Sequence, residues 1–127
     1  MEAAKTILIC EDEESLRELV RVALGTRYRY LEAANGDDGL ELARRLRPDL
    51  LVLDLMLPGR SGLEILDALR ADTELAGMPV VVVSAWSDAE LDAMEAGADH
   101  FLAKPFDPDE LNLTVERMLA RREPGSG

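Results

Sequence analysis

The sequence predicts an α/β protein in which helices cover both faces of a parallel five-stranded sheet, an open doubly wound sandwich. Three observations lead to this fold class. Short apolar runs alternate with helical patterns, the strand–helix order repeats five times, and four of the runs contain no charged residue. A run without polar positions indicates a strand buried on both faces, because a half-exposed strand would alternate apolar and polar residues.

The expected strands differ in polarity. One segment, 28–33, contains Arg29 and Glu32, and charged residues of this kind are typical of an edge strand. The other four are uniformly apolar, and we expect them to be central strands: residues 7–10, 50–53, 80–83 and 101–103.

Helices are expected between the strands because apolar residues recur there at three- and four-residue spacing. The fourth is short and ends before Gly97, and the fifth begins with Asp107 as N-cap and Pro108 at the first helical position. The positions expected to face the core are, helix by helix, Leu16, Leu19, Val20, Ala23 and Leu24; Leu40, Ala43 and Leu46; Leu63, Leu66 and Leu69; Leu91 and Met94; and Leu111, Val115, Met118 and Leu119.

Five consecutive strand–helix units joined by right-handed crossovers favour the flavodoxin-like (βα)5 arrangement with strand order 2-1-3-4-5. This order places the ligand crevice between the first and third strands of the chain, at their carboxyl ends, where the strand order reverses. We expect one domain over residues 1–122. The remaining five residues, 123–127, have linker composition, so they are either a natural flexible tail or a junction to a further segment.

Composition narrows the function classes. A formal net charge of −12 with only 4% aromatic residues argues against direct nucleic-acid binding and against anionic membranes. The single Cys10 cannot form an internal disulfide, and we expect it to be a small core residue. Without an apolar run of transmembrane length or a secretory segment, a cytoplasmic location is expected.

Polar side chains follow each apolar strand at the point where it ends. Because parallel strands place their carboxyl ends at one edge of the sheet, we expect these side chains to converge. They are Glu11 and Asp12, then Asp54, then Ser84, and finally Lys104 and Pro105.

The loop after the first strand carries four acids, 11–14, where a nucleotide-binding relative would carry glycines. Glu13 and Glu14 are interpreted as helix-start residues that the helix dipole favours. Glu11 and Asp12 are instead interpreted as ligands of Mg²⁺, with Mn²⁺ as an alternative, because hard oxygen donors suit these ions.

Asp54 ends an otherwise apolar strand, so a metal ion on one side and the Lys104 ammonium on the other are expected to keep it ionised. An ionised aspartate can attack phosphorus and form an acyl phosphate. Taken alone, Asp54 could equally cap the turn at 58–59, Ser84 could satisfy a turn, and Lys104 could be a surface lysine. Together with the acid pair Glu11 and Asp12, these three residues occupy four successive strand ends, and this joint pattern favours a phosphoryl-accepting site.

These residues lie in motifs that resemble the receiver domain of two-component response regulators over nearly the full length of the chain. The motifs carrying the resemblance are residues 7–13, 54–62, 83–85, 95–98 and 104–106. Two positions depart from the commonest pattern: Glu11 stands where Asp is frequent, and Phe101 where Tyr is frequent. The stretch from Ser84 to Lys104 is also about two residues shorter than usual, which shortens the fourth helix.

The resemblance implies a role for each matching residue. Asp54 would be the phosphoacceptor, Lys104 and Ser84 would bind phosphoryl oxygens, and Phe101 would swing inward with Ser84. Asp12 and Asp54 would ligate Mg²⁺ directly, with Glu11 acting mainly through water. The remaining implied roles are a metal-ligating backbone carbonyl at Met56 and a cis peptide bond before Pro105.

The expected function is therefore a signalling switch that assists its own phosphorylation and dephosphorylation, not a turnover enzyme. The partners implied are a sensor histidine kinase or phosphotransfer protein, and a downstream effector, output domain or second copy of the chain. The surface of the fourth helix, last strand and fifth helix would carry the signal. The chain would be a stand-alone protein or part of a larger regulator or hybrid kinase.

Two other functions fit part of the pattern. A haloacid-dehalogenase-like phosphatase or phosphotransferase also uses an aspartyl phosphate, but it needs a second acid two residues after the nucleophile, where this chain has Met56. An interaction module that has lost phosphorylation is the other alternative. The joint presence of Asp12, Asp54, Ser84 and Lys104 argues against it.

Overall fold

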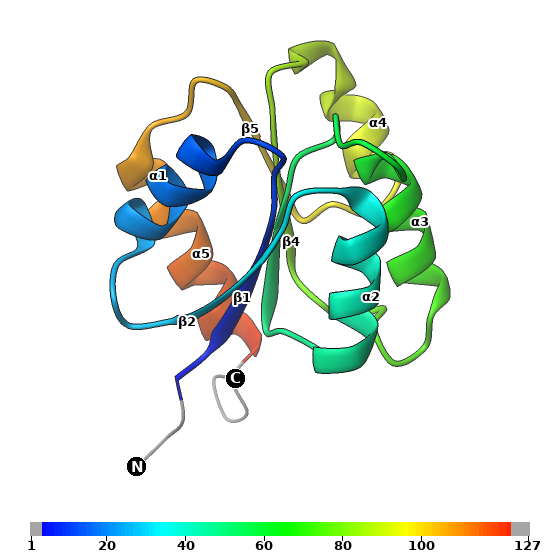
Figure 1. Cartoon of the computed structure of the whole chain (residues 1–127), viewed down its shortest axis with the longest axis horizontal. Helices are drawn as coiled ribbons and strands as arrows, with labels where there is room; N and C mark the ends of the chain where they lie inside the picture. Colours follow the sequence, from blue (N-terminus) through cyan, green and yellow to red (C-terminus); the bar gives the residue numbers. More distant parts are fainter. Residues whose placement is uncertain (1–3, 123–127) are drawn as a thin grey trace.

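The computed structural model of the protein describes residues 4–122, in which strands and helices alternate along the chain (Figure 1). The elements are β1 (Thr6–Cys10), α1 (Glu14–Leu24), β2 (Arg29–Ala33), α2 (Gly36–Leu46), β3 (Leu50–Leu53), α3 (Gly62–Ala71), β4 (Val80–Ser84), α4 (Glu90–Glu95), β5 (His100–Ala103) and α5 (Pro108–Arg122). A short 3₁₀ turn, Ser87–Ala89, precedes α4. The expected tail, 123–127, lies outside the described residues.

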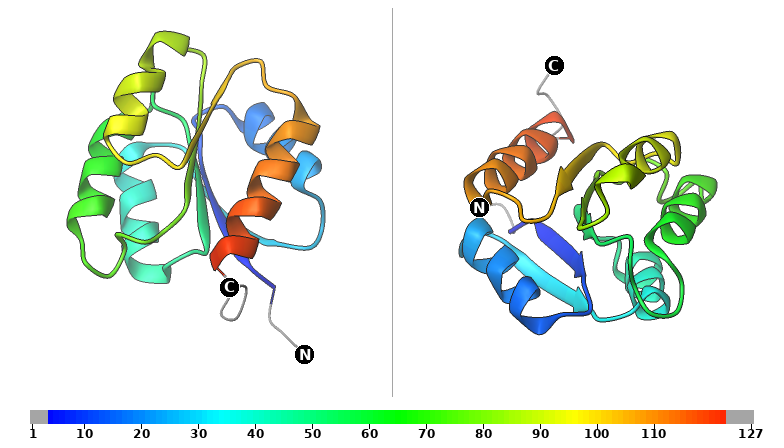
Figure 2. Two further views of the ribbon diagram at one scale, coloured as in Figure 1. Left: turned by 180° about the vertical axis from the view of Figure 1, so that it is seen from behind. Right: turned by 90° about the horizontal axis from the view of Figure 1, so that it is seen from above.

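The sheet is parallel throughout, with strand order β2-β1-β3-β4-β5. The predicted doubly wound fold and strand order are thus confirmed. Helices α1 and α5 cover one face of the sheet, and α2, α3 and α4 cover the other, as the view from above shows (Figure 2).

Each face of the sheet has its own apolar core, because side chains alternate along a strand. In β1, Leu8 and Cys10 pack with residues of α2 and α3, whereas Ile7 and Ile9 pack with residues of α1 and α5. Cys10 is fully buried, as expected for a core residue, and burial raises the pKa of its thiol to about 12.

One strand prediction is wrong. The segment 101–103 was expected to be a central strand, but β5 lies at the edge of the sheet beside β4. Its burial reflects this position: Leu102 is buried, Phe101 is partly exposed and Ala103 is exposed. The run is apolar because α4 and α5 flank it, not because strands pair with it on both sides.

The apolar face of α4 is also different from the expected one. Leu91 and Met94 were predicted to face the core, yet they are 68% and 41% exposed. The buried positions are Ala93 and, in the preceding 3₁₀ turn, Ala89. This six-residue helix therefore packs through alanine, and its longer apolar side chains are exposed. Leu19 of α1 and Leu46 of α2 are likewise exposed rather than buried.

The expected start of α5 is confirmed, since the Asp109 N–H donates to Asp107 Oδ1 at 2.9 Å. A capping box starts α3: the Glu64 N–H donates to Ser61 Oγ, and the Ser61 N–H donates to Glu64 Oε1. This cap fixes where the loop after β3 ends and α3 begins.

The loop between β3 and α3 is held against the start of α2. The Gly36 N–H donates to the Pro58 carbonyl oxygen at 2.9 Å, and Arg60 Nε donates to Asp37 Oδ1 at 3.0 Å. A Cβ at Gly36 would stand 1.9 Å from the Arg60 carbonyl oxygen, so glycine is required for this approach. The backbone that follows Asp54 is therefore fixed by a neighbouring helix.

Candidate functional site

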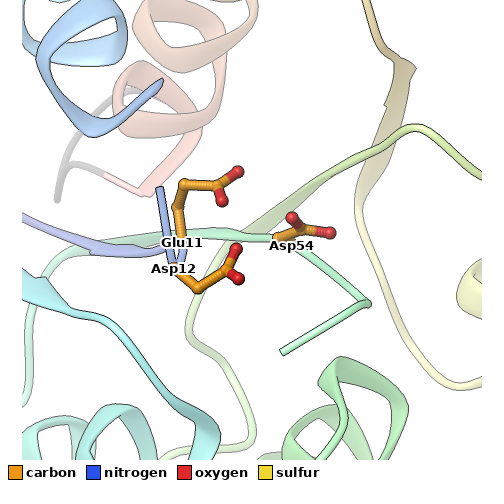
Figure 3. Close-up of side chains that lie close together, drawn as sticks. All are labelled: Glu11, Asp12 and Asp54. Carbon is orange, nitrogen blue, oxygen red and sulfur yellow. The ribbon is translucent and has the colours of Figure 1, made fainter. Parts of the chain in front are cut away.

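The carboxyl ends of β1 and β3 bring three acids together. Glu11 and Asp12 follow β1, and Asp54 follows the paired strand β3. One carboxylate oxygen from each of the three lies within 4.8 Å of the other two. Figure 3 shows the Glu11 and Asp12 side chains extending from adjacent positions toward the side on which Asp54 lies.

Lys104, directly after β5, reaches across the strand ends to two of these acids. Its Nζ donates to Glu11 Oε1 at 2.5 Å and to Asp54 Oδ2 at 2.9 Å. Burial by itself lowers the pKa of Lys104, but the hydrogen bonds to Glu11 and Asp54 outweigh it, and the net pKa is raised. The ammonium therefore stays charged at neutral pH.

Glu11 is buried, and burial is the main reason that its pKa is raised. Hydrogen bonds from Lys104 and from the Glu13 N–H oppose this rise, whereas the charge of Asp54 adds to it. A buried acid among acids is destabilised in its charged form, and a cation at the site relieves this.

Asp54 is 6% exposed, which is unusual for a carboxylate at a loop. Its Oδ1 accepts the Met56 N–H at 3.0 Å, and its Oδ2 accepts Lys104. The alternative in which Asp54 caps a turn is thus partly realised, through Met56 and not through residues 58–59. The same contacts fix the orientation of the carboxylate.

The other predicted site residues lie in the strands and loops around this cluster. Ser84 is buried at the end of β4, where its Oγ accepts the Trp86 N–H and its carbonyl oxygen accepts the Lys104 N–H. Phe101 lies in β5 and packs against the α2–α3–α4 core. The Lys104–Pro105 peptide bond is cis. The side chains of Met56 and Trp86 are both exposed.

Arg17 contacts the site, and this contact was not predicted from the sequence. It lies in the second turn of α1, and its Nη1 donates to the Glu11 carbonyl oxygen at 2.7 Å. The interaction is made to a backbone atom, so no pairing of residue types in the sequence indicates it. Only its place shortly after the acidic loop could have suggested it.

The donor set fits Mg²⁺. Three carboxylates offer hard oxygen atoms within reach of one ion, and one ammonium contacts two of them, which leaves the cluster negative. Magnesium sites are commonly built from one or two direct carboxylates, with water completing the octahedron. The same donors also accept Mn²⁺.

Within residues 4–122, no helix has the length and apolar character needed to cross a membrane.

Comparisons with known proteins agree with this geometry. A family model described as the response regulator receiver domain matches residues 7–116. The phosphate regulon transcriptional regulatory protein PhoB of Pseudomonas aeruginosa is 39% identical over 95% of this chain and 54% of its own length. The DNA-binding response regulator MtrA of Mycolicibacterium smegmatis is 39% identical over 92% of this chain and 51% of its own. The chain thus spans about half the length of these relatives.

Solved structures show the same fold. A putative response regulator from Chloroflexus aurantiacus has a TM-score of 0.89 and 33% identity, covering 94% of this chain and 100% of that one. The chemotaxis response regulator CheY4 of Vibrio cholerae has a TM-score of 0.84 and 26% identity, covering 91% and 99%. The fold, the acidic cluster and the family match agree: this chain belongs to the receiver domain family of two-component response regulators, which are signalling domains.

Proposed function

We propose that this receiver is a phosphoryl-activated switch in which Asp54 accepts the phosphoryl group. The observation that carries the proposal is the environment of the Asp54 carboxylate. It is buried, it is oriented by the Met56 N–H and the Lys104 ammonium, and it lies in one cluster with the carboxylates of Glu11 and Asp12. A nucleophile held next to a fixed cation and a metal-binding pair is suited to phosphoryl transfer.

In the proposed reaction, an Asp54 oxygen attacks the phosphorus of a phosphohistidine in line. The new O–P bond forms as the N–P bond breaks, and the histidine nitrogen keeps the electron pair of the broken bond. Lys104 already contacts Asp54, and its ammonium stabilises charge on the transferring oxygens. Asp12, Asp54 and the Met56 carbonyl would hold Mg²⁺ or Mn²⁺, with Glu11 acting through water. This ion supplies further charge neutralisation when it is bound.

The signal is proposed to leave through Ser84 and Phe101. Ser84 Oγ accepts the Trp86 N–H in the segment leading to α4, so a Ser84 hydroxyl that turns toward a phosphoryl oxygen releases that contact. Phe101 lies in the neighbouring strand β5 and is only partly buried. The surface of α4, β5 and α5 then differs between the two states.

The proposed partners are a sensor histidine kinase or phosphotransfer protein upstream, and an effector, output domain or second copy of the chain downstream. PhoB and MtrA are named as a transcriptional regulatory and a DNA-binding protein, and a Formosa agariphila relative, 34% identical, is named a histidine kinase. The domain itself, at net charge −12, is not expected to contact nucleic acid or anionic membranes. We propose a cytoplasmic location for the protein. We also propose that the receiver domain spans residues 1–122.

The decisive experiment is incubation of the purified protein with acetyl phosphate and Mg²⁺, followed by intact mass measurement. We expect a gain of one phosphoryl group that is lost in Asp54→Asn and in the presence of a chelator. Asp67→Asn is the matched control, because Asp67 is an exposed aspartate of α3 away from the cluster. A chain that gains no mass, or gains it equally in Asp54→Asn, would be an interaction module or would use another acceptor.

A phosphatase or phosphotransferase that uses an aspartyl phosphate predicts a different outcome. It would turn over a phosphate ester many times, whereas the proposed switch takes up one phosphoryl group. The exposed Met56 stands where that chemistry needs a second acid. Release of phosphate in large molar excess over protein would therefore favour the enzyme and contradict the switch.

A further inference from the structure

Arg17 of α1 is a partly buried cation that joins three elements near the acidic cluster. Its side chain is 16% exposed. Nη1 donates to the Glu11 carbonyl oxygen at 2.7 Å, and Nε donates to Glu32 Oε1 of β2 at 3.0 Å. The rigid guanidinium thus connects α1, the acidic loop and the edge strand.

The backbone N–H, the backbone carbonyl and the carboxylate of Glu11 each make a hydrogen bond, and Arg17 supplies the one to the carbonyl. The Glu11 N–H donates to the Ala33 carbonyl oxygen of β2 at 3.0 Å. Its carboxylate accepts Lys104 and the Glu13 N–H. Its carbonyl oxygen accepts Arg17, which sets the orientation of the peptide that leads directly into Asp12. Asp12 is exposed, so the orientation of this peptide helps to determine where its carboxylate lies relative to Asp54.

We propose that Arg17 is a positioning residue of the metal site: by holding the Glu11 carbonyl it aims the adjacent carboxylates at Asp54. The inference rests on the proposed Mg²⁺ site, and it assigns to Arg17 no contact with the ion or the phosphoryl group. Residues that orient metal ligands in this indirect way typically change metal affinity by about 10- to 100-fold when they are replaced.

The direction in which Mg²⁺ affinity changes in an Arg17 variant distinguishes a positioning role from a purely electrostatic one. Removing a nearby positive charge makes a cation site more negative, so a purely electrostatic role predicts tighter Mg²⁺ binding in an Arg17 variant. A positioning role predicts weaker binding, because the Glu11–Asp12 peptide loses its restraint. The two roles therefore give opposite shifts of the Mg²⁺ dissociation constant.

Arg21 provides a matched control on the same helix. Its Nη1 donates to the same Glu32 oxygen, at 2.5 Å, but no contact joins it to the Glu11 carbonyl in the described structure. Arg17→Met and Arg21→Met each remove one positive charge and one ion pair to Glu32 from α1. They differ in the bond to Glu11, which only Arg17 makes.

The test is isothermal titration of the metal-free protein with Mg²⁺, with thermal unfolding recorded on the same samples. We expect Arg17→Met to raise the dissociation constant by about tenfold. Arg21→Met should leave it unchanged or slightly lower. A dissociation constant in Arg17→Met equal to or below the wild-type value overturns the proposal. An equal rise in both variants also overturns it, because the Glu11 bond would then be irrelevant.

Phosphorylation by acetyl phosphate gives an independent readout. Its dependence on Mg²⁺ concentration should shift in Arg17→Met, while the rate at saturating Mg²⁺ stays near the wild-type rate. A general loss of structure would instead lower the saturated rate and the unfolding temperature together. If Arg17→Met does not fold, Arg17→Gln takes its place with the same expected and overturning results. A wild-type protein that binds no Mg²⁺ would refute the proposed site itself, which is a different result from an unaltered Arg17 variant.

Discussion

Lys104 shows how much of the site depends on single side chains. Its ammonium is shared between Glu11 and Asp54, which reduces the repulsion between two buried acids. Lys104, Glu11, Asp12 and Asp54 could be predicted from the sequence, because each directly follows a strand and parallel strands end at the same edge. Arg17 could not, because its contact depends on a side-chain conformation and a backbone oxygen.

At the residue scale, Asp12 is predicted to destabilise the metal-free protein. Its carboxylate lies within 4.8 Å of those of Glu11 and Asp54, and Lys104 bonds to those two but not to Asp12. Removing the charge in Asp12→Asn should raise the free energy of unfolding by on the order of 1 kcal/mol. Thermal unfolding in the presence of a chelator measures this.

Added Mg²⁺ should then stabilise Asp12→Asn less than the wild type, because a ligand has been lost. Asp67→Asn of α3 is again the control, and it should change neither quantity. A lower unfolding temperature for Asp12→Asn without metal would mean that the acids are not in repulsive contact.

At the scale of elements, the existence of each strand and helix followed from the sequence, but the buried face of α4 did not. A six-residue helix has too few positions for periodicity to define a face, and the largest apolar residues, Leu91 and Met94, were taken as the core positions. The packing of this helix instead uses Ala93. Similarly, the apolar character of 101–103 could not distinguish a central strand from an edge strand flanked by helices.

The contact between α2 and the β3–α3 loop gives the prediction at this scale. Gly36→Ala would place a methyl group 1.9 Å from the Arg60 carbonyl oxygen, so the loop must shift. We expect a loss of about 1–3 kcal/mol in unfolding free energy, the range typical of an overpacked site. Urea denaturation measures it.

Mg²⁺ binding should weaken in Gly36→Ala as well, because the shifted loop contains Met56 and follows Asp54. Gly77→Ala is the matched control, since a Cβ there meets no atom within 4 Å. That variant should stay within about 0.5 kcal/mol of the wild type. Equal stability of the two variants would show that the loop adapts without strain.

At the scale of the whole molecule, the strand order and the net charge could be predicted from the sequence. Whether the protein acts with other domains could not. The order β2-β1-β3-β4-β5 follows from repeated strand–helix units. The chain spans about half the length of PhoB and MtrA, and its own residues do not indicate what lies beyond the receiver domain in those relatives.

The pH dependence of stability is a property of the whole molecule to which Glu11 contributes in a defined direction. Burial raises the pKa of Glu11 in the folded state, so the folded protein binds this proton more tightly than the unfolded chain. The resulting stabilisation is full below the unfolded pKa, about 4.3, and is lost as the pH rises through the higher folded pKa.

Without metal, Glu11→Gln should therefore gain stability relative to the wild type as the pH rises from about 4 to neutral. Thermal unfolding of both proteins across this range, in chelator, measures the difference. A difference that does not vary with pH would show that the folded state leaves the Glu11 proton affinity unchanged. Mg²⁺ affinity of the wild type should fall over the same range on acidification, because protons compete for the carboxylate.

The small buried surface of α4 affects how often this helix separates from the rest of the domain. Ala93 is the one residue of this helix that is fully covered, so little apolar surface is uncovered when the helix lifts away. Opening free energies follow the apolar contact that is lost, and α4 should therefore open far more often than the sheet beneath it. Its amide hydrogens are expected to exchange with solvent early. Helix α4, a part of the proposed output surface, would then already sample a detached form before any phosphoryl group arrives.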